Sequence, residues 1–407
     1  MRQIITHFTD NDLYTFTVQY YILQTYPKAE VKYRFFDRNN FKYPQGFGQK
    51  LKEQLEGMRN VVITDEEIDF MRKSCYFLPE WYFTFLKGYR FNPNEVEIFQ
   101  DPCGYLNIMI SGKWYSTVMW EMPILSTISE LMHEINGDLD KVDKLKEYER
   151  AYHKGLMAFR NGVRLSDMGT RRRFSHEIQR EVIMGLTDAY NDWKKEDIDG
   201  EFIGTSNVWF AKEFGLRPVG TMSHQIVSFE ECVSGIFECN YSVMDKWSRC
   251  YDGLAGIYLY DCFGDKVFFN NLCTRLAKTY DGLRVDSGDE KEQLEKILNK
   301  YRELHINPKS KSVVFSNALT IDKAIELHRY VNYRIQDSYG IGTHLCADVL
   351  NTETNEKFTY SNIVIKLIGM RLNENREWHN CVKLSCDKGK TLGDSEKCEY
   401  LLKAIGK

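Results

Sequence analysis

The chain has 407 residues, of which 43% are hydrophobic and 28% are charged, a composition typical of soluble globular proteins. Its net charge of −4 gives no global basic field for nucleic acid, and no apolar run reaches the length of a membrane span. The N-terminus has no apolar core of a secretory signal, and the eleven cysteines form no CxxC pair. We therefore expect a cytoplasmic protein with reduced thiols that binds neither nucleic acid nor membranes.

The first third of the chain mixes strand and helix patterns. AEVKYRFFDR alternates apolar and polar residues as a strand does, and EVEIFQD and LNIMISG are further strand candidates. MWEMPILSTISELMHEI predicts a mostly buried helix. These patterns indicate an α+β domain in which the only sign of chemistry lies near Tyr14.

From about Asn161 the pattern repeats: a short apolar strand, a polar or glycine-rich turn, and an amphipathic helix. The strand-and-turn stretches are VRLSDMGT, FIGTSN, PVGTMSH, GIYLYD, LRVDSGD, SVVFSNA and RIQDSYGIGT. Repeated strand–helix units predict a parallel sheet, and seven of them favour an irregular (β/α) barrel over a doubly wound sheet. The turns at the carboxyl ends of the strands then share one face, where the active sites of such folds lie.

Three consecutive arginines, Arg171, Arg172 and Arg173, are predicted to open a helix. Cations at a helix N-terminus oppose the macrodipole unless an anion is bound. An anion site for at least one of them is favoured over a solvated charge run or pairing with Asp167 and Glu177.

The stretch GLRVDSGD places Arg284 and Asp286 on one face of a strand, directed to the barrel mouth if Leu283 and Val285 face the helices. A guanidinium there suits a planar carboxylate, although a structural Arg–Asp pair explains the pattern equally well. SYGIGTH could cradle a phosphate, but alone it is more typical of an ordinary turn.

His224 lies in GTMSHQ, which begins sixteen residues after GTSN, so the two turns are expected side by side on the same face. Small neighbours leave room for a ligand. Taken alone, such a histidine is more often structural than functional.

As a set, these stretches resemble the nicotinate phosphoribosyltransferase family. The motifs that occur in the family's order are FTDNDLYTFT, GTRRRFS, GTSN, GTMSHQ, GLRVDSGD, VVFSNAL, SYGIGTHL, NIVIKL and VKLSCDKGKT. The resemblance implies an α/β fold, with an irregular barrel over residues 151–369 and an α+β domain built from residues 1–150 and 370–407. It also implies a homodimer with active sites at the subunit interface.

The reaction implied by the resemblance is the condensation of nicotinate with phosphoribosyl pyrophosphate to nicotinate mononucleotide and pyrophosphate, the first step of NAD salvage from nicotinate. ATP hydrolysis is coupled to it through a phosphohistidine, which looks like His224. Mg²⁺ is expected to be held mainly by the substrate phosphates, with no metal ligand assigned to the protein.

The resemblance further implies roles for the other candidate residues. Arg284, with Arg171 close by, resembles the ligand of the nicotinate carboxylate, and Tyr14 resembles the aromatic that stacks on the pyridine ring from the partner subunit. Asp286 and Ser287 resemble ligands of the ribose and pyrophosphate. The remaining implied site residues are Asp261, an active-site aspartate; Thr205, Ser206 and Ser316, substrate contacts; and Gly340, Gly342 and Thr343, a cradle for the 5′-phosphate.

Two positions depart from the family pattern. Gln225 stands where many members have Glu, which leaves open whether a carboxylate orients the histidine or tunes its pKa. Asn317 stands where the family often has Asp, and a neutral side chain there supplies no charge.

Two alternatives to this function remain. A nicotinamide phosphoribosyltransferase would resemble this chain, but in that family an Asp stands at the position of Ser206, and its carboxylate would repel nicotinate. A non-catalytic nucleotide-binding regulator on the same scaffold would be expected to lose His224, Arg284 or Asp286, and all three are present.

Overall fold

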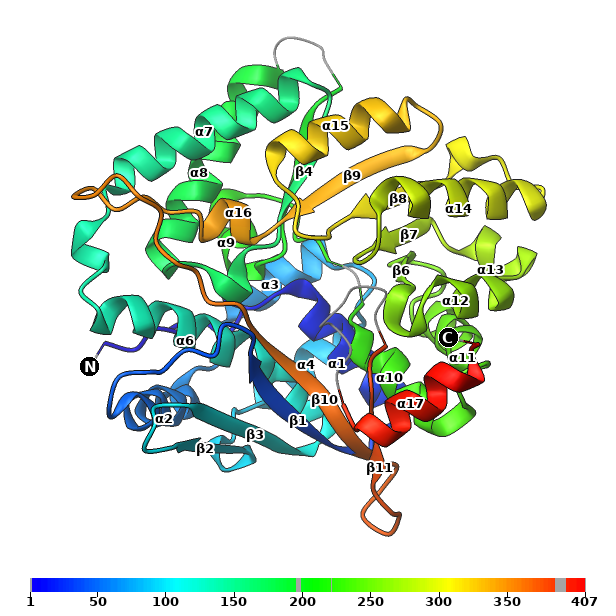
Figure 1. Cartoon of the computed structure of the whole chain (residues 1–407), viewed down its shortest axis with the longest axis horizontal. Helices are drawn as coiled ribbons and strands as arrows, with labels where there is room; N and C mark the ends of the chain where they lie inside the picture. The colour runs from blue at the N-terminus through cyan, green and yellow to red at the C-terminus, as the bar shows by residue number, and fades with distance from the viewer. Residues whose placement is uncertain (1, 195–198, 221, 385–392, 407) are drawn as a thin grey trace.

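The computed structural model describes the whole chain except residues 1, 195–198, 221, 385–392 and 407. Position 221 of GTMSHQ and the whole SCDKGKT part of VKLSCDKGKT therefore lie outside the described residues. None of the described helices is long and apolar enough to cross a membrane. The chain forms two sheets, one antiparallel and one parallel, that lie next to each other (Figure 1).

The antiparallel sheet joins the N-terminal region to the end of the chain. Its strand order is β11-β10-β1-β3-β2. The bounds are β1 (Glu30–Asp37), β2 (Val96–Gln100), β3 (Leu106–Lys113), β10 (Ile363–Arg371) and β11 (His379–Asn380). The three strands expected in the first third are β1, β2 and β3, so that prediction is confirmed.

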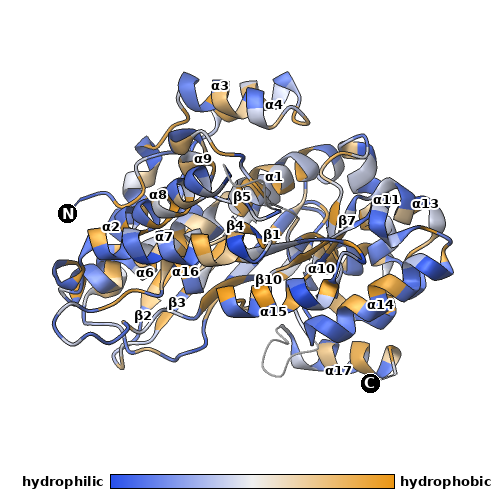
Figure 2. Cartoon of the chain, turned by 90° about the horizontal axis from the view of Figure 1, so that it is seen from above, coloured by the Kyte–Doolittle hydropathy of each residue, from blue (hydrophilic) through white to orange (hydrophobic). Residues whose placement is uncertain are grey.

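Helices pack around this sheet and beside it. Their bounds are α1 (Leu13–Thr25), α2 (Phe47–Gly57), α3 (Asp65–Ser74), α4 (Glu80–Gly88), α5 (Trp114–Thr117), α6 (Glu121–Ile135) and α17 (Ser395–Ala404). α6 is the buried helix expected from the sequence, since most of its residues are inaccessible to solvent. α3 and α4 form an outlying pair at one edge of the molecule (Figure 2).

The parallel sheet has the order β5-β4-β9-β8-β7-β6, with every neighbouring pair parallel. Its bounds are β4 (Arg164–Asp167), β5 (Glu201–Thr205), β6 (Ile257–Leu259), β7 (Gly282–Val285), β8 (Ser312–Phe315) and β9 (Gln336–Ile341). Because β4 lies between β5 and β9, the chain returns to its starting strand as a barrel does. The predicted α/β class, with an irregular barrel and a second α+β part, is confirmed.

The stretch PVGTMSH was expected to be a seventh strand, and this expectation is wrong. It contributes only an isolated bridge, in which Pro218 pairs with Thr205 and the Val219 N–H donates to the Thr205 carbonyl at 2.9 Å. Proline has no N–H with which to continue a ladder. The sheet is therefore not closed by regular strand pairing at this point, and a helix starts there instead.

The helices that precede, connect and follow the barrel strands are α7 (Lys144–Arg160), α8 (His176–Trp193), α9 (Val208–Phe214), α10 (His224–Ser234), α11 (Cys239–Cys250), α12 (Asp265–Asn271), α13 (Thr274–Thr279), α14 (Glu290–Glu303), α15 (Ile321–Val331) and α16 (Thr343–Cys346). α14 buries an apolar stripe made of Leu294, Ile297, Leu298 and Tyr301. Both hydropathy colours are visible along this helix in Figure 2, as expected of an amphipathic helix.

The expected domain division does not coincide with the ends of elements. The boundary at residue 150 falls within α7, which packs against α8 of the barrel. β10 begins at Ile363, before the boundary at residue 370, and pairs with β1. The antiparallel sheet therefore receives its returning strand several residues earlier than expected.

Candidate active site

A cavity of about 360 Å³ lies at the carboxyl ends of the barrel strands. One wall comes from the turns after β4, β7, β8 and β9. The opposite wall comes from the antiparallel sheet, through Tyr33 of β1 and residues 364–367 of β10. The predicted gathering of the strand-end turns on one face is thus the basis of the site, and the second sheet covers it.

The cavity is lined by more cations than anions. The cationic side chains are Arg38, Arg171, Arg172, Arg284, Lys366 and Lys383, and the acidic ones are Glu121 and Asp286. Within the described residues, neither Arg38 nor Arg171 forms an ion pair. Burial, together with these two neighbouring guanidiniums, lowers the pKa of Arg172 to about 9. Crowded, unpaired cations of this kind suit a multiply charged anion such as a phosphate.

The three consecutive arginines do not open a helix as expected. Thr170–Arg172 form a short 3₁₀ turn, and α8 begins only at His176, because the Ser175 side chain caps it by accepting from the Ile178 N–H at 3.1 Å. The helix thereby avoids placing several cations at its positive end.

Arg173 turns away from the cavity that its two neighbours line. It is fully buried and donates to both carboxylate oxygens of Asp10, at 2.6 and 2.8 Å. Its partner is thus neither Asp167 nor Glu177, which the sequence suggested.

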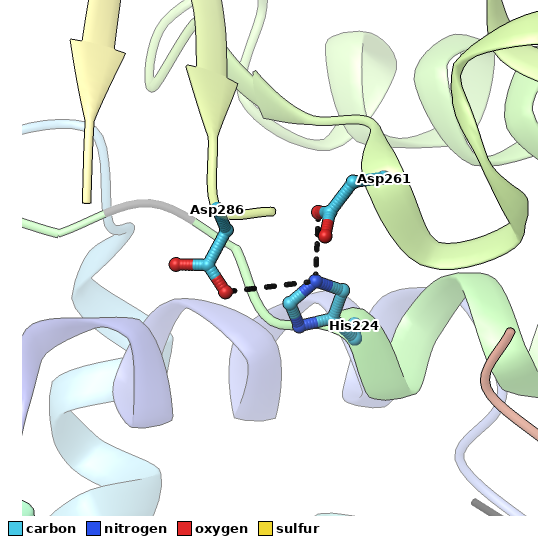
Figure 3. A group of neighbouring side chains, drawn as sticks. All are labelled: His224, Asp261 and Asp286. Carbon is cyan, nitrogen blue, oxygen red and sulfur yellow. Dashed lines mark hydrogen bonds and ion pairs between the residues drawn. The ribbon is translucent and has the colours of Figure 1, made fainter. Parts of the chain in front are cut away.

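His224 is the first residue of α10 and lies between two aspartates (Figure 3). Its Nε2 is 2.8 Å from Oδ1 of Asp261 and 3.9 Å from Oδ2 of Asp286. The Lys383 ammonium lies 3.0 Å from the same nitrogen. Ser287 donates to the other oxygen of Asp261 at 2.6 Å, which fixes that carboxylate.

These neighbours set the protonation state of the imidazole. Burial and the charge of Lys383 lower the pKa of His224 to about 4, although Asp261 opposes the shift. Burial tends to raise the pKa of Asp261, but His224 and Lys383 hold it well below its usual range. An ionised Asp261 can only accept a hydrogen bond and its contact with Nε2 is shorter than that of the Lys383 ammonium, so we assign the hydrogen to Nε2, which leaves a lone pair on Nδ1 and no hydrogen bond from Lys383 to the ring. Nδ1 is the ring nitrogen on the side away from both carboxylates in Figure 3.

Arg284 and Asp286 form the structural pair that one interpretation of the sequence predicts, and both also line the cavity, so binding of a carboxylate by Arg284 stays a prediction. Arg284 Nη2 donates to Asp286 Oδ1 at 2.9 Å, and its Nε donates to the Ser316 hydroxyl at 2.7 Å. That hydroxyl donates in turn to Asp286 Oδ1 at 2.7 Å. Although burial opposes the shift, the Arg284 guanidinium helps to lower the pKa of Asp286 to about 2, and the side chain is ionised.

Comparisons with known proteins agree with this geometry. The model of the nicotinate phosphoribosyltransferase (NAPRTase) family matches residues 163–403, and that of its N-terminal domain matches residues 9–129. The chain belongs to the nicotinate phosphoribosyltransferase family. It is 37% identical to a nicotinate phosphoribosyltransferase of Desulforapulum autotrophicum over 99% of both chains. It is 35% identical to one of Methanosarcina acetivorans, with 89% of this chain and 90% of that one covered. The crystal structure of a nicotinate phosphoribosyltransferase from Porphyromonas gingivalis matches with a TM-score of 0.92 and 34% identity, covering 99% of this chain and 100% of that chain.

Most of the candidate residues taken from the family lie around the cavity. Those that line it are Tyr14, Arg171, His224, Arg284, Asp286, Ser316, Gly340, Gly342 and Thr343. The Tyr14 hydroxyl donates to Glu121 at 2.8 Å, which holds the ring in the cavity of its own chain. Their roles toward substrates remain predictions, but the structure brings them together.

Four candidate residues lie behind the cavity wall. Asp261 contacts His224, which lines the cavity, and Ser287 donates a hydrogen bond to Asp261. Thr205 donates to Asp167 at 2.7 Å, and Ser206 donates to Asp12 at 2.8 Å, and both hydroxyls are buried. Thr205 and Ser206 therefore do not line the cavity, and the structure does not bring them to where a direct substrate contact would lie.

The two glycines of SYGIGTH have a packing role as well as a place in the cavity. A Cβ at Gly340 would lie 2.4 Å from the sulfur of Met168, and one at Gly342 would lie 2.5 Å from the Met168 carbonyl. At Gly342 the backbone of the turn after β4 approaches so closely that only glycine fits, whereas at Gly340 the Met168 side chain would have to move. Their occurrence alone is thus no proof of a phosphate cradle.

Sequence reasoning missed several charged residues of the cavity. Arg38 follows β1, Glu121 begins α6, and Lys366 lies in β10. Only Lys366 carried a signal, because a lysine inside the apolar run IVIKL needs a reason to be there. Arg38 and Glu121 reach the site through the packing of one sheet on the other, which no local pattern reveals.

Proposed function

We propose that the protein condenses nicotinate with phosphoribosyl pyrophosphate to give nicotinate mononucleotide and pyrophosphate, the first step of NAD salvage from nicotinate. We further propose that it couples this reaction to ATP hydrolysis through a phosphohistidine at His224. The observation that carries the proposal is a neutral imidazole, oriented by an ionised aspartate, at the edge of a cavity lined by unpaired cations. Membership of the family supports the same reaction.

The first step is attack of His224 Nδ1 on the γ-phosphorus of ATP, with ADP as the leaving group. Asp261 holds the Nε2–H and so keeps the lone pair on Nδ1, and it stabilises the positive charge that develops on the ring. The phosphoryl group then lies at the N-terminus of α10, where free backbone N–H groups favour an anion. Water later cleaves the N–P bond, giving phosphate and restoring the imidazole.

The second step is glycosyl transfer. The pyridine nitrogen attacks C1 of the ribose, the C1–oxygen bond breaks, and pyrophosphate leaves through an oxocarbenium-like transition state comparable to that of glycoside hydrolysis. Arg171 and Arg284 suit the nicotinate carboxylate, and the Tyr14 ring suits the pyridine face. Arg38 and Arg172 are placed to neutralise the leaving pyrophosphate.

Mg²⁺ fits this site when held mainly by the substrate phosphates. The donor atoms of His224, Asp261 and Asp286 all lie within 4.8 Å of one another. Both oxygens of Asp261 already accept hydrogen bonds, from His224 and Ser287, whereas Oδ2 of Asp286 accepts none among the described residues. Asp286 Oδ2 is therefore the protein oxygen that would hold the ion, which would supply charge neutralisation to the pyrophosphate.

Nicotinamide is the less favoured substrate. An amide NH₂ needs an acceptor, but Ser206 and the Asp12 carboxylate bonded to it lie outside the cavity lining, while Arg171 and Arg284 lie within it. Two guanidiniums favour an acid over an amide.

We also propose that the protein is a homodimer in which each active site contains residues of both subunits, as the family resemblance implies. Tyr14 and His224 line the same cavity of one chain, so mixing Tyr14→Ala protein with His224→Ala protein tests whether Tyr14 acts in the partner's site instead. If it does, mixed dimers contain one site with neither substitution and recover activity. Recovery absent from a mixture shown to contain the heterodimer would refute a contribution of Tyr14 from the partner subunit.

The reaction itself is tested by measuring pyrophosphate release with nicotinate, nicotinamide and quinolinate, each with and without ATP. We expect turnover with nicotinate, stimulated by ATP, and no activity with nicotinate would overturn the proposal. Incubation with γ-labelled ATP should give acid-labile label on the protein. Label retained on the His224→Ala variant would refute the assignment of the nucleophile.

A further inference from the structure

Two cysteines lie side by side behind the active site, where three segments of the chain meet. Cys232 belongs to α10, Cys381 follows β11, and their sulfurs are 3.8 Å apart. The third segment is α17, labelled in Figure 1. Its Lys397 Nζ lies 3.3 Å from Sγ of Cys232. Cys381 is buried and Cys232 is only partly buried, so a dissolved oxidant reaches Cys232 first.

The surroundings divide the two thiols into a nucleophile and a resolving partner. Donation from the Cys381 S–H, with the charge of Lys397, lowers the pKa of Cys232, although burial and Glu231 oppose the shift. Burial and the adjacent Cys232 raise the pKa of Cys381, which stays protonated. Lys397 also pairs with Glu231 at 2.5 Å, so the ammonium is fixed beside the sulfur. A partly exposed thiolate next to a second thiol is the arrangement found in redox-sensitive pairs.

We propose that Cys232 and Cys381 form a reversible disulfide in the presence of a hydroperoxide. The Cys232 thiolate attacks one peroxide oxygen, the O–O bond breaks, and the departing hydroxide takes up a proton, leaving a sulfenic acid. The Cys381 sulfur then attacks the sulfenic sulfur, and the hydroxyl leaves with the thiol proton as water. In sum, two thiols and hydrogen peroxide give one disulfide and two waters, and a dithiol reductant reverses the change.

The disulfide would link the two segments that carry His224 and its neighbour Lys383. α10 begins with His224, and Lys383, two residues beyond Cys381, lies 3.0 Å from its Nε2. A disulfide requires the sulfurs to approach from 3.8 Å to about 2.05 Å, and to the extent that side-chain rotation does not close this gap, α10 and the segment around Cys381 move toward each other. This shift displaces Lys383 from the imidazole. Oxidation therefore slows ATP-coupled turnover, a consequence that rests on the proposed function.

The site is tested on the full-length reduced protein, treated with hydrogen peroxide and mapped by differential alkylation and mass spectrometry. We expect a linked peptide pair containing Cys232 and Cys381 that dithiothreitol separates. Cys250, a partly buried thiol whose pKa burial raises to about 11, serves as the matched control and should stay reduced. In Cys381→Ser protein, dimedone should trap a sulfenic acid at Cys232. Oxidation of Cys250 in preference to this pair, or no linked peptide, would overturn the proposal.

A second experiment compares the rate of pyrophosphate release before and after oxidation. We expect turnover with nicotinate and ATP to fall by about tenfold or more in the native sequence, because small displacements at a reacting centre have large effects on rate. Cys232→Ser and Cys381→Ser proteins should be unaffected by the same treatment. Unchanged turnover in fully disulfide-linked protein would overturn the link to the site. If the reduced protein had no activity with nicotinate, the proposed function would be wrong. The peptide map would still show whether the disulfide forms.

Discussion

Arg171 and Arg173 are two residues apart in the chain, yet the fold places them in opposite electrostatic settings. Arg173 has no exposed surface and forms a bidentate pair with Asp10. Arg171 lines the cavity beside Arg172 and Arg38, with no ion pair among the described residues. The paired guanidinium holds the N-terminal region against the barrel, whereas the unpaired one leaves a positive charge available for an anion.

The contrast shows that pairing, rather than residue type, separates structural from binding cations in this protein. A buried pair is costly to break because its remaining partner is then an uncompensated charge. An unpaired cluster weakens the fold through mutual repulsion and gains stability when an anion binds. Substitutions at the two positions should therefore affect different properties.

The largest effect on stability is expected for Arg173→Ala. Removing the guanidinium leaves the Asp10 carboxylate buried without its partner, so we expect the free energy of unfolding to fall by about 3–5 kcal/mol, measured by urea denaturation. The control is Arg249→Ala, which removes an exposed arginine paired with Asp245 and should change stability by no more than about 1 kcal/mol. Similar losses for the two variants would contradict the distinction.

Arg171→Gln should change activity rather than stability. Losing a charge-assisted contact costs about 1.5–3 kcal/mol, so kcat/KM for nicotinate should fall by about 10- to 150-fold. The free energy of unfolding should stay the same or rise slightly, because repulsion with Arg172 and Arg38 is relieved. Arg164→Gln, at the opposite end of β4 and paired with Glu201, is the control and should retain full activity. A large loss of stability in Arg171→Gln would show that this arginine is structural too.

The fold was predictable where local patterns decide it. The alternating strands of the first third and the repeated strand–helix units appear as expected, because side-chain periodicity and burial select them. The errors at Ser175 and Pro218 have local physical causes: a serine cap outcompeted the arginines as a helix start, and a proline stopped a ladder. Both signals are present in the sequence, but their effect depends on which neighbouring strand is available.

The site was predictable at the ends of the barrel strands and not across the sheets. Turns after parallel strands must meet, so Arg284 and Asp286 could be placed from topology, whereas His224 follows the isolated bridge at Pro218 rather than the strand expected there. Arg38 and Lys366 belong to the other sheet, and their distance from the histidine is set by packing between the two parts. For the same reason the sequence did not show that Arg173 has its partner in Asp10, far away in the chain.

A pH dependence distinguishes the unpaired cations further. Burial lowers the pKa of Lys366 to about 8, although Glu121 opposes the shift. The cation is thus present below this pH and lost above it, so kcat/KM for phosphoribosyl pyrophosphate should fall about tenfold between pH 7 and pH 9. Lys366→Arg should remove this decline, since arginine keeps its charge, and Lys366→Met should be low throughout. A flat profile for the native sequence would contradict an anion-binding role for this lysine.

The smallest expected effect comes from changing a neutral residue of the cavity into an anion. The Gln225 carbonyl accepts from the Tyr33 hydroxyl at 2.5 Å and from the Trp114 indole at 3.0 Å. Gln225→Glu keeps an oxygen that can accept both hydrogen bonds and adds a negative charge beside His224 and the cavity cations. The pKa of His224 should rise from about 4, so the loss of ATP hydrolysis on acidification should begin at higher pH, by about one unit or less.

The same substitution partly neutralises the cations, so KM for phosphoribosyl pyrophosphate should rise by a few-fold, about 1 kcal/mol or less. Gln225→Leu separates charge from hydrogen bonding, because it leaves two buried donors without an acceptor and should cost about 1–3 kcal/mol of stability. If Gln225→Glu changed neither the pH at which ATP hydrolysis is lost on acidification nor KM for phosphoribosyl pyrophosphate, a carboxylate at this position would have no electrostatic effect on the site. The role of this position would then lie in accepting the two hydrogen bonds from Tyr33 and Trp114, which glutamine and glutamate can do equally well.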